Sequence, residues 1–162
     1  GLLDYDLSRE SAYQLRCAKH LLGARNLSHV SQLVSRIELD FDGRKLLLVH
    51  GSPWDPMLGY IYPDSDLSVF DALNYDRVFM GHTHRPFISG KAVNVGSCGL
   101  PRDVGNLPSC CIYDSIENQV QIFRLRIDRD LLVRKYGSQV HPTVMSCLSR
   151  EAPEYFGDLV YE

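Results

Sequence analysis

With 162 residues, of which 44% are hydrophobic and 23% are charged, the chain has the size of one domain and can bury an ordinary globular core. Its formal net charge of −3 excludes a general electrostatic attraction to nucleic acids or to anionic membranes. The chain has five cysteines and no Cys-x-x-Cys pair, which is typical of a reducing compartment. It has no apolar run near the roughly 18 residues of a membrane span and no signal-peptide pattern. These observations predict a cytoplasmic protein.

Two helices are predicted at the start of the chain. Ser8 is a suitable N-cap for a helix that runs to about Leu22, and Gly23 offers the stop. A shorter helix begins at Asn26 or Ser28. Both helices are expected to pack on the core, the second through its apolar side chains Leu27, Val30, Leu33 and Val34.

A hairpin is predicted next. Residues 36–41 alternate between charged and apolar side chains, which is typical of a half-buried strand. Asp42-Gly43 is a strong turn sequence, and the apolar residues 46–49 form the second strand. This second strand ends directly at His50.

An aromatic loop follows at residues 51–65, with three prolines and the side chains of Trp54, Tyr60 and Tyr62. Such a loop is suited to forming one wall of a pocket. A short helix is expected from Asp66, as its cap, to Leu73.

A buried strand over 78–80 stops at Gly81, where His82 and His84 follow. Residues 86–88 and 92–95 are predicted to form strands joined by a turn at Ser89-Gly90.

The last strong strand patterns are an antiparallel pair at 109–113 and 120–127, with a bulge expected where the apolar phase shifts between Ile122 and Phe123. Asp128 can cap a helix to Tyr136, and the weakly patterned segment 141–162 leaves room for one more helix. We expect one α/β domain over 1–162, with its core at about 8–136 and a tail at 137–162.

Three histidines are expected to meet at one edge of the sheet. His50, His82 and His84 follow the ends of buried strands, where open sheets bind their ligands. Neutral imidazole is a good ligand for Zn, Mn, Fe, Ni or Co. A single histidine at a strand end is more often structural, so both readings stay open. A metallo-β-lactamase-like site is set aside because Arg85-Pro86 occupies the place of the required Asp-His.

Three segments together resemble the later motifs of the calcineurin-like metallophosphoesterases, in particular the small bacterial and archaeal phosphodiesterase branch. They are His50-Gly51-Ser52-Pro53, Gly81-His82-Thr83-His84-Arg85-Pro86-Phe87 and Asn94-Val95-Gly96-Ser97-Cys98-Gly99-Leu100-Pro101-Arg102-Asp103. The resemblance implies a two-layer β-sandwich flanked by helices and a dinuclear metal centre. By analogy, His50 and His82 bind one ion and His84 binds the other.

The early carboxylate motifs of that family are missing, because the chain contains neither Asp-x-His nor Asn-His. Neutral imidazoles alone do not offset the repulsion between two divalent ions. We therefore expect the sequence to be the C-terminal part of such a domain, incomplete at its N-terminus, and Gly1 in place of Met agrees with this. Substitute carboxylates stay open as an alternative, from Asp55, Asp64, Asp66 or Asp103.

Arg85 and Arg102 are the candidate catalytic residues, because guanidinium groups beside the metals can bind phosphate oxygens. Structural salt bridges are the alternative role for both. The expected function is hydrolysis of a phosphodiester or nucleotide-type substrate with two divalent metal ions, manganese being favoured over Fe, Ni, Co or Zn. A non-catalytic scaffold or regulatory module is the competing hypothesis. We expect no specific nucleic-acid or membrane partner, and a homo-oligomer is left open.

Overall fold

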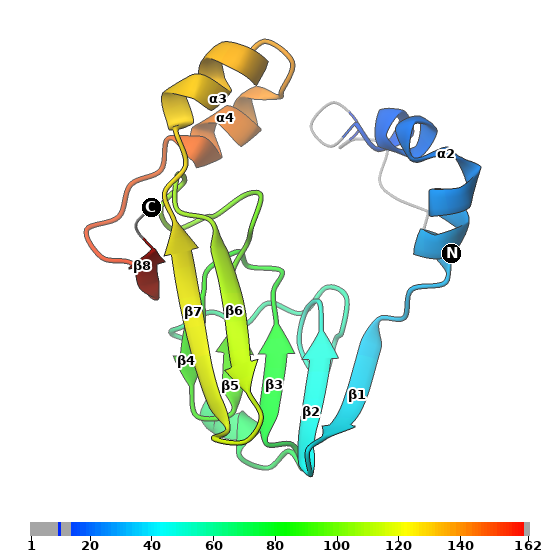
Figure 1. Cartoon of the computed structure of the whole chain (residues 1–162), viewed down its shortest axis with the longest axis vertical. Helices are drawn as coiled ribbons and strands as arrows, with labels where there is room; N and C mark the ends of the chain where they lie inside the picture. Colours follow the sequence, from blue (N-terminus) through cyan, green and yellow to red (C-terminus); the bar gives the residue numbers. More distant parts are fainter. Residues whose placement is uncertain (1–9, 11–13, 161–162) are drawn as a thin grey trace.

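The computed structural model describes residue 10 and residues 14–160, and their helices and strands form an α/β fold with two sheets (Figure 1). The larger sheet has five strands in the order β1-β2-β3-β5-β4: β1 (Arg36–Phe41), β2 (Arg44–Val49), β3 (Arg77–Met80), β4 (Phe87–Ser89) and β5 (Ala92–Asn94). The smaller sheet consists of β6 (Ser109–Asp114), β7 (Gln119–Leu125) and β8 (Asp158–Val160). The helical segments are α2 (Leu15–Ser31), the 3₁₀ turn η2 (Ser68–Phe70), α3 (Arg129–Tyr136) and α4 (Pro142–Leu148).

Strand direction in the larger sheet determines where the histidines lie. β2, β3 and β5 run parallel, while β1 and β4 are antiparallel to their neighbours. The predicted turn at Asp42-Gly43 is confirmed, with φ of 52° and 73°. Positive φ at both central residues is the geometry that a two-residue hairpin requires. The carboxyl ends of the three parallel strands therefore share one edge.

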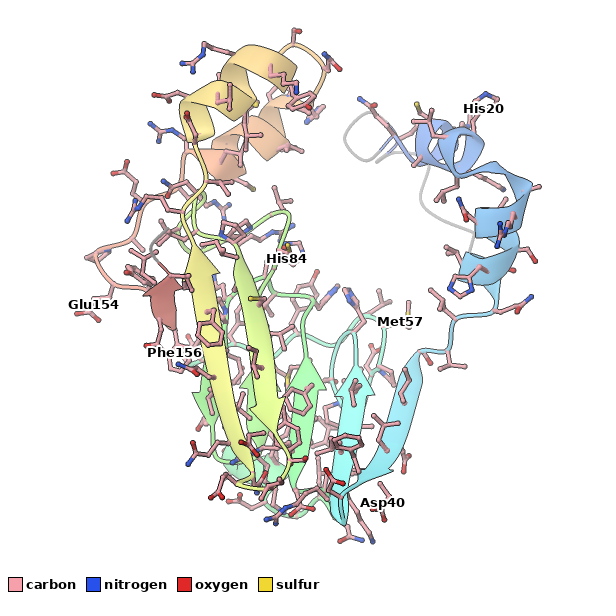
Figure 2. All side chains as sticks on the ribbon, in the orientation of Figure 1. His20, Asp40, Met57, His84, Glu154 and Phe156 are labelled. Carbon is pink, nitrogen blue, oxygen red and sulfur yellow. The ribbon has the colours of Figure 1, made fainter. Side chains whose placement is uncertain are left out.

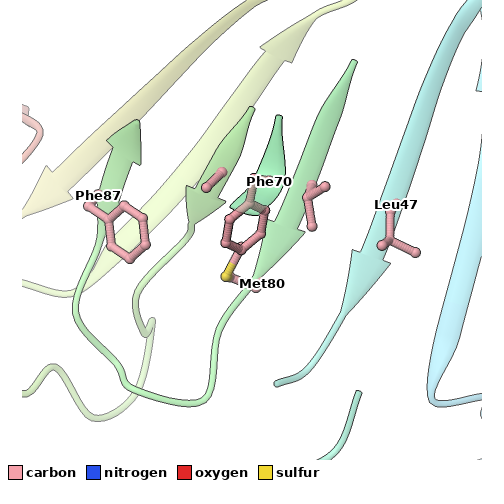
Figure 3. Close-up of a cluster of buried hydrophobic side chains, with 6 residues drawn as sticks. Leu47, Phe70, Met80 and Phe87 are labelled. Atoms are coloured by element: carbon pink, nitrogen blue, oxygen red, sulfur yellow. The ribbon is translucent and has the colours of Figure 1, made fainter. Parts of the chain in front are cut away.

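The main apolar core lies on one face of the larger sheet (Figure 3). Phe70 of η2 packs there among side chains from four strands, namely Leu47, Val78, Met80, Phe87 and Ala92. On the other face, the Phe79 ring lies 5.5 Å from the ring of Tyr113 on β6. The aromatic loop and η2 thus cover one face, and the smaller sheet covers the other (Figure 1).

Strand β1 forms as predicted, but the expectation that it is half-buried is wrong. Its side chains are exposed throughout, including Ile37 at 43% and Phe41 at 54%. β1 is an edge strand that pairs only with β2 among the described strands. Alternation within a strand sets which side chains share a face, but burial requires another element to cover that face.

The N-terminal helices are only partly as expected. Ser8 lies outside the described residues. Gly23 breaks α2 with φ 70° and ψ 166°, as predicted, so that two helical pieces meet at a kink. The expectation that the second piece packs inward is wrong, because Val30 is 37% exposed. Leu33 and Val34 lie beyond the end of α2 and are 54% and 68% exposed. In Figure 1 this helix stands away from both sheets.

Residues 66–73 form less helix than predicted. Only the single turn η2 is present, although Asp66 Oδ1 does accept hydrogen bonds from Ser68 N at 3.1 Å and Ser68 Oγ at 2.6 Å. Phe70 is the one fully buried side chain of the segment, Leu67 and Leu73 pack partly against the core, and Val69 is exposed. These contacts are made by a single helical turn, and a helix this short is not stable by itself.

The β6–β7 pair is confirmed, but the expected bulge is absent. Pairing is continuous from Ser109↔Arg124 to Asp114↔Gln119. The apolar phase shifts in the sequence because Arg124, fully buried, follows Ile122 on the inward face of β7. The three-residue strand β8, parallel to β7, was not predicted.

Both C-terminal helices match expectation. Asp128 caps α3 by accepting a hydrogen bond from Leu131 N at 2.9 Å. α4 is the further helix for which the sequence left room, and His141 caps it. Across the described residues, no helix is long and apolar enough to cross a membrane.

Candidate metal centre

The three predicted histidines lie beyond one edge of the larger sheet. His50 follows β2 directly, and His82 and His84 follow β3 after Gly81. All three line one cavity of about 350 Å³. Figure 2 shows His84 at this edge and Asp40, near the hairpin turn, at the opposite end of the sheet. The shared direction of the parallel strands is what brings the histidines together.

His50 and His82 are in direct contact. The distance between His50 Nε2 and His82 Nδ1 is 2.9 Å, and the two rings meet edge-on at 77°. Tyr60 from the aromatic loop packs against His82, with ring centroids 4.2 Å apart. The Nε2 atom of His82 is buried and has no hydrogen-bond partner among the described residues.

His84 is oriented by the loop that follows β5. Its Nδ1 lies 2.7 Å from the carbonyl oxygen of Leu100. A carbonyl can only accept, so Nδ1 carries the proton and Nε2 has a free lone pair. Ser97 Oγ accepts from Leu100 N at 2.9 Å, and Arg102 N donates to His84 O at 3.1 Å. Metal-binding histidines commonly have such a carbonyl partner on the other ring nitrogen.

The histidine loop has an uncommon backbone. His82 has φ 62° and His84 φ 59°, both in the left-handed region, which costs a non-glycine residue about 1–2 kcal/mol. Asn94, fully buried, supports this loop from β5. Its amide donates to Gly81 O at 2.8 Å and to Thr83 Oγ1 at 3.0 Å, and its oxygen accepts from Gly96 N at 3.0 Å.

The surroundings favour neutral imidazoles. Burial is the main cause that lowers the pKa of His82, and the positive charges of His50, His84 and Arg102 lower it further. Burial also lowers the pKa of His84, against the opposing effect of its hydrogen bond to Leu100. Metal ligands must be deprotonated, so these lowered pKa values suit metal binding.

The spacing of His50 and His82 suits two ligands of one divalent ion. Two nitrogens that occupy neighbouring positions about 2.1 Å from one ion lie roughly 3 Å apart, which agrees with the 2.9 Å between the nitrogens of His50 and His82. His84 has a free Nε2 in the same cavity. However, the described residues contain no group of three or more His, Cys, Asp or Glu side chains able to hold one ion.

No substitute carboxylate lines the histidine cavity. Asp55 Oδ1 accepts from the backbone N–H groups of Met57 and Leu58. Asp66 accepts from Ser68, and both oxygens of Asp103 bind Arg124. These three aspartates are therefore engaged elsewhere, and Asp64 does not line the cavity either.

Arg85 and Arg102 line an adjoining cavity of about 590 Å³ that contains none of the histidines. In the described part of the chain, neither guanidinium makes an ion pair, so the structural salt bridges considered for them are not present there. Arg102 connects the two cavities through its backbone bond to His84.

Sequence reasoning missed three residues around these cavities: Thr83, Arg124 and Arg150. Thr83 lies inside the motif, but no role was predicted for it; it is buried and accepts a hydrogen bond from the Asn94 amide. Arg124 could have been found from its inward position in the alternation of β7. Arg150 has no local pattern, because only the tertiary fold brings it beside Arg102, whose carbonyl oxygen accepts from its Nη1 at 3.2 Å.

Comparisons with known proteins identify the family of the chain. Residues 5–118 match the Calcineurin-like phosphoesterase superfamily domain. An uncharacterized protein of Methanocaldococcus jannaschii is 30% identical over 98% of this chain and 68% of its own length. Because the family match begins at residue 5, it gives no support to the expectation of a C-terminal fragment.

Two solved structures share the fold. A hypothetical protein of Pyrococcus horikoshii OT3 superposes with a TM-score of 0.73 and 18% identity over 98% of this chain. The chain spans 64% of that protein's length. A metallophosphoesterase from Sphaerobacter thermophilus gives a TM-score of 0.70 and 23% identity over 91% of this chain and 70% of its own. These similarities confirm the expected metallophosphoesterase-like α/β fold.

Proposed function

Because this chain belongs to the calcineurin-like phosphoesterase superfamily, we propose that it is a divalent-metal-dependent phosphoesterase that hydrolyses phosphodiester or nucleotide-type substrates. The observation that carries the proposal is the contact between His50 and His82, with His84 in the same cavity. Three imidazoles from two strand exits, with pKa values lowered for two of them, form a set of neutral nitrogen ligands.

In this proposal His50 and His82 hold one ion, and His84 offers Nε2 to a second. Divalent metal ions bound there, manganese being favoured, supply charge stabilisation on phosphoryl oxygens and activation of the attacking water. The chain's own part is orientation. Leu100 fixes the His84 ring, and Asn94 holds the backbone that carries both motif histidines.

The two arginines are proposed to bind the substrate. Arg102 lies close enough to the histidines for its charge to lower the pKa of His82 and His84. Arg85 directly follows His84 in the chain. Guanidinium groups at this position can pair with non-bridging phosphate oxygens and orient the ester.

A second candidate is metal binding without turnover. The absence of a carboxylate from the lining of the histidine cavity favours it, since neutral ligands balance the charge of two close divalent ions poorly. The scaffold or regulatory role considered from the sequence would follow from such a site.

Hydrolysis of bis(p-nitrophenyl) phosphate with and without Mn²⁺ separates the two functions. The enzyme proposal expects manganese-dependent turnover that falls at least about 100-fold in His82→Asn, because asparagine tolerates the left-handed backbone but lacks the imidazole. His20→Asn, on an exposed helical position, is the matched control. Manganese binding without turnover in the unmodified chain would favour the second candidate, and the absence of both would exclude the proposed metal site.

A further inference from the structure

We propose that the cavity beside the histidines binds a second phosphate group of the substrate. This inference rests on the proposed function. The cavity, here called the arginine groove, is lined by residues from four separate segments, including Arg85, Arg102, Arg150, Tyr155 and Phe156. Its volume of about 590 Å³ leaves room for a group beyond the one at the metals.

The groove is lined by three arginines and three acidic residues, so what matters is which of these charges are already paired. Of its three acidic residues, Asp103 gives both oxygens to Arg124, at 2.6 and 3.0 Å. Glu151 lies 3.9 Å from Arg129, outside the groove. Glu154 lines the groove from the loop before β8 (Figure 2). Asp103 is therefore committed to buried Arg124, whereas the Glu151 pair is long and exposed, and in the described part of the chain none of the three groove guanidiniums makes an ion pair.

One unused donor points to an anion. The Nε atom of Arg102 is buried and has no hydrogen-bond partner among the described residues. An unsatisfied buried donor on a charged group is costly, so a ligand that accepts from it gains affinity. Guanidinium groups match tetrahedral oxyanions better than a lysine would, because their fork of donors binds two oxygens at once.

Arg150 is held in place by the loop that carries Arg102. Its Nη1 donates to Arg102 O at 3.2 Å, and its own carbonyl oxygen accepts from Gly105 N at 2.9 Å. Since Arg102 N also bonds to His84 O, one continuous set of contacts links Arg150 to the histidine loop. A substrate phosphate at Arg150 would therefore lie at a defined position relative to an ester at the histidines.

The first test measures the groove without metal. We expect inorganic pyrophosphate to bind the chelator-treated protein in isothermal titration calorimetry, and Arg150→Gln to weaken it about 10-fold. Arg150→Lys, which keeps the charge, should recover part of the affinity. Arg25→Gln on exposed α2 is the control. Equal affinity in Arg150→Gln and Arg25→Gln, or no binding at all, would overturn the proposal.

The second test compares substrates that differ only in a second phosphate, namely thymidine 5′-(p-nitrophenyl phosphate) with and without a 3′-phosphate. We expect a KM about 10-fold lower with the 3′-phosphate, and this difference should disappear in Arg150→Gln but persist in Arg25→Gln. Equal KM values in the unmodified protein, with turnover intact, would overturn the groove but leave the proposed hydrolysis standing. Lack of turnover on every ester would instead overturn the hydrolysis, and calorimetry would still decide whether the groove binds phosphate.

Discussion

The Nδ1 atom of His84 lies 2.7 Å from the carbonyl oxygen of Leu100, which joins the loop after β3 to the loop after β5. Because the carbonyl accepts, the proton of the neutral ring is assigned to Nδ1. This one bond both orients the ring and leaves Nε2 free in the cavity. The relationship can be tested without any metal.

We predict that neutral His84 is the Nδ1–H tautomer in the metal-free protein. Nitrogen-15 chemical shifts from long-range proton–nitrogen correlation spectra at pH 8 distinguish the two tautomers. His20, on the exposed surface of α2, should show the mixture dominated by the Nε2–H form that is usual in water. A His84 spectrum with the proton on Nε2 would contradict the assignment.

Arg124→Met should destabilise the protein by about 3–5 kcal/mol. Arg124 is fully buried and bonds to Asp103, to Leu107 O and to Phe156 O, so its removal leaves a carboxylate and two carbonyls without their donor. Urea unfolding measures the change in the free energy of unfolding.

The control for that variant is Arg129→Gln. Arg129 forms ion pairs of 3.6 and 3.9 Å at the surface, and exposed pairs contribute only about 0–1 kcal/mol. Combining Arg124→Met with Asp103→Asn should recover part of the loss, because it removes the unpaired charge. Equal stability of Arg124→Met and Arg129→Gln would contradict the structural role of the buried pair.

Gly51→Ala should disturb the backbone next to His50. A Cβ atom at Gly51 would lie 2.6 Å from Asp55 O and 2.7 Å from Gly59 N, so the loop must move. We expect a loss of about 1–3 kcal/mol in stability, together with weaker Mn²⁺ binding.

Gly99→Ala provides the matched control in the other site loop, because nothing lies within 4 Å of its added Cβ. Thermal unfolding and manganese titration of both variants make the comparison. If Gly51→Ala behaves like Gly99→Ala in both measurements, the close approach of the aromatic loop to Gly51 is not essential to the site.

Cys111 should be alkylated more slowly than the adjacent Cys110. Burial, with a smaller effect from Cys110, raises the pKa of Cys111 to about 11, so at pH 8 only on the order of a thousandth of it is thiolate. Its alkylation by iodoacetamide should rise as the pH approaches 11, whereas exposed Cys110 should already react at pH 8. Mass spectrometry of tryptic peptides measures both sites, and equally fast labelling at pH 8 would contradict the prediction.

Local chemistry made much of the fold predictable. The turn at Asp42-Gly43 and the cap at Asp128 depend on residues close in sequence, and both are present. The histidine cavity was also foreseeable, because parallel strands place their ends at one edge.

Burial and long-range pairing were not predictable in the same way. The exposure of β1 depends on whether another element covers it. The alternation of residues within the strand does not predict this. Arg124 is a charged residue at an inward-facing position of β7. It pairs with Asp103, which is 21 residues away in the sequence. Arg150 reaches Arg102 across 48 residues, so only the tertiary structure shows that they share a groove.

The left-handed backbone at His82 and His84 favours different residues for stability than for activity. A saturation library at the two positions, sorted only for cellular abundance, should enrich glycine, asparagine and aspartate, since these adopt positive φ with least strain. The same library sorted for phosphoester cleavage should return histidine. The difference between the two enrichments would measure how far this loop has been shaped against its own conformational preference.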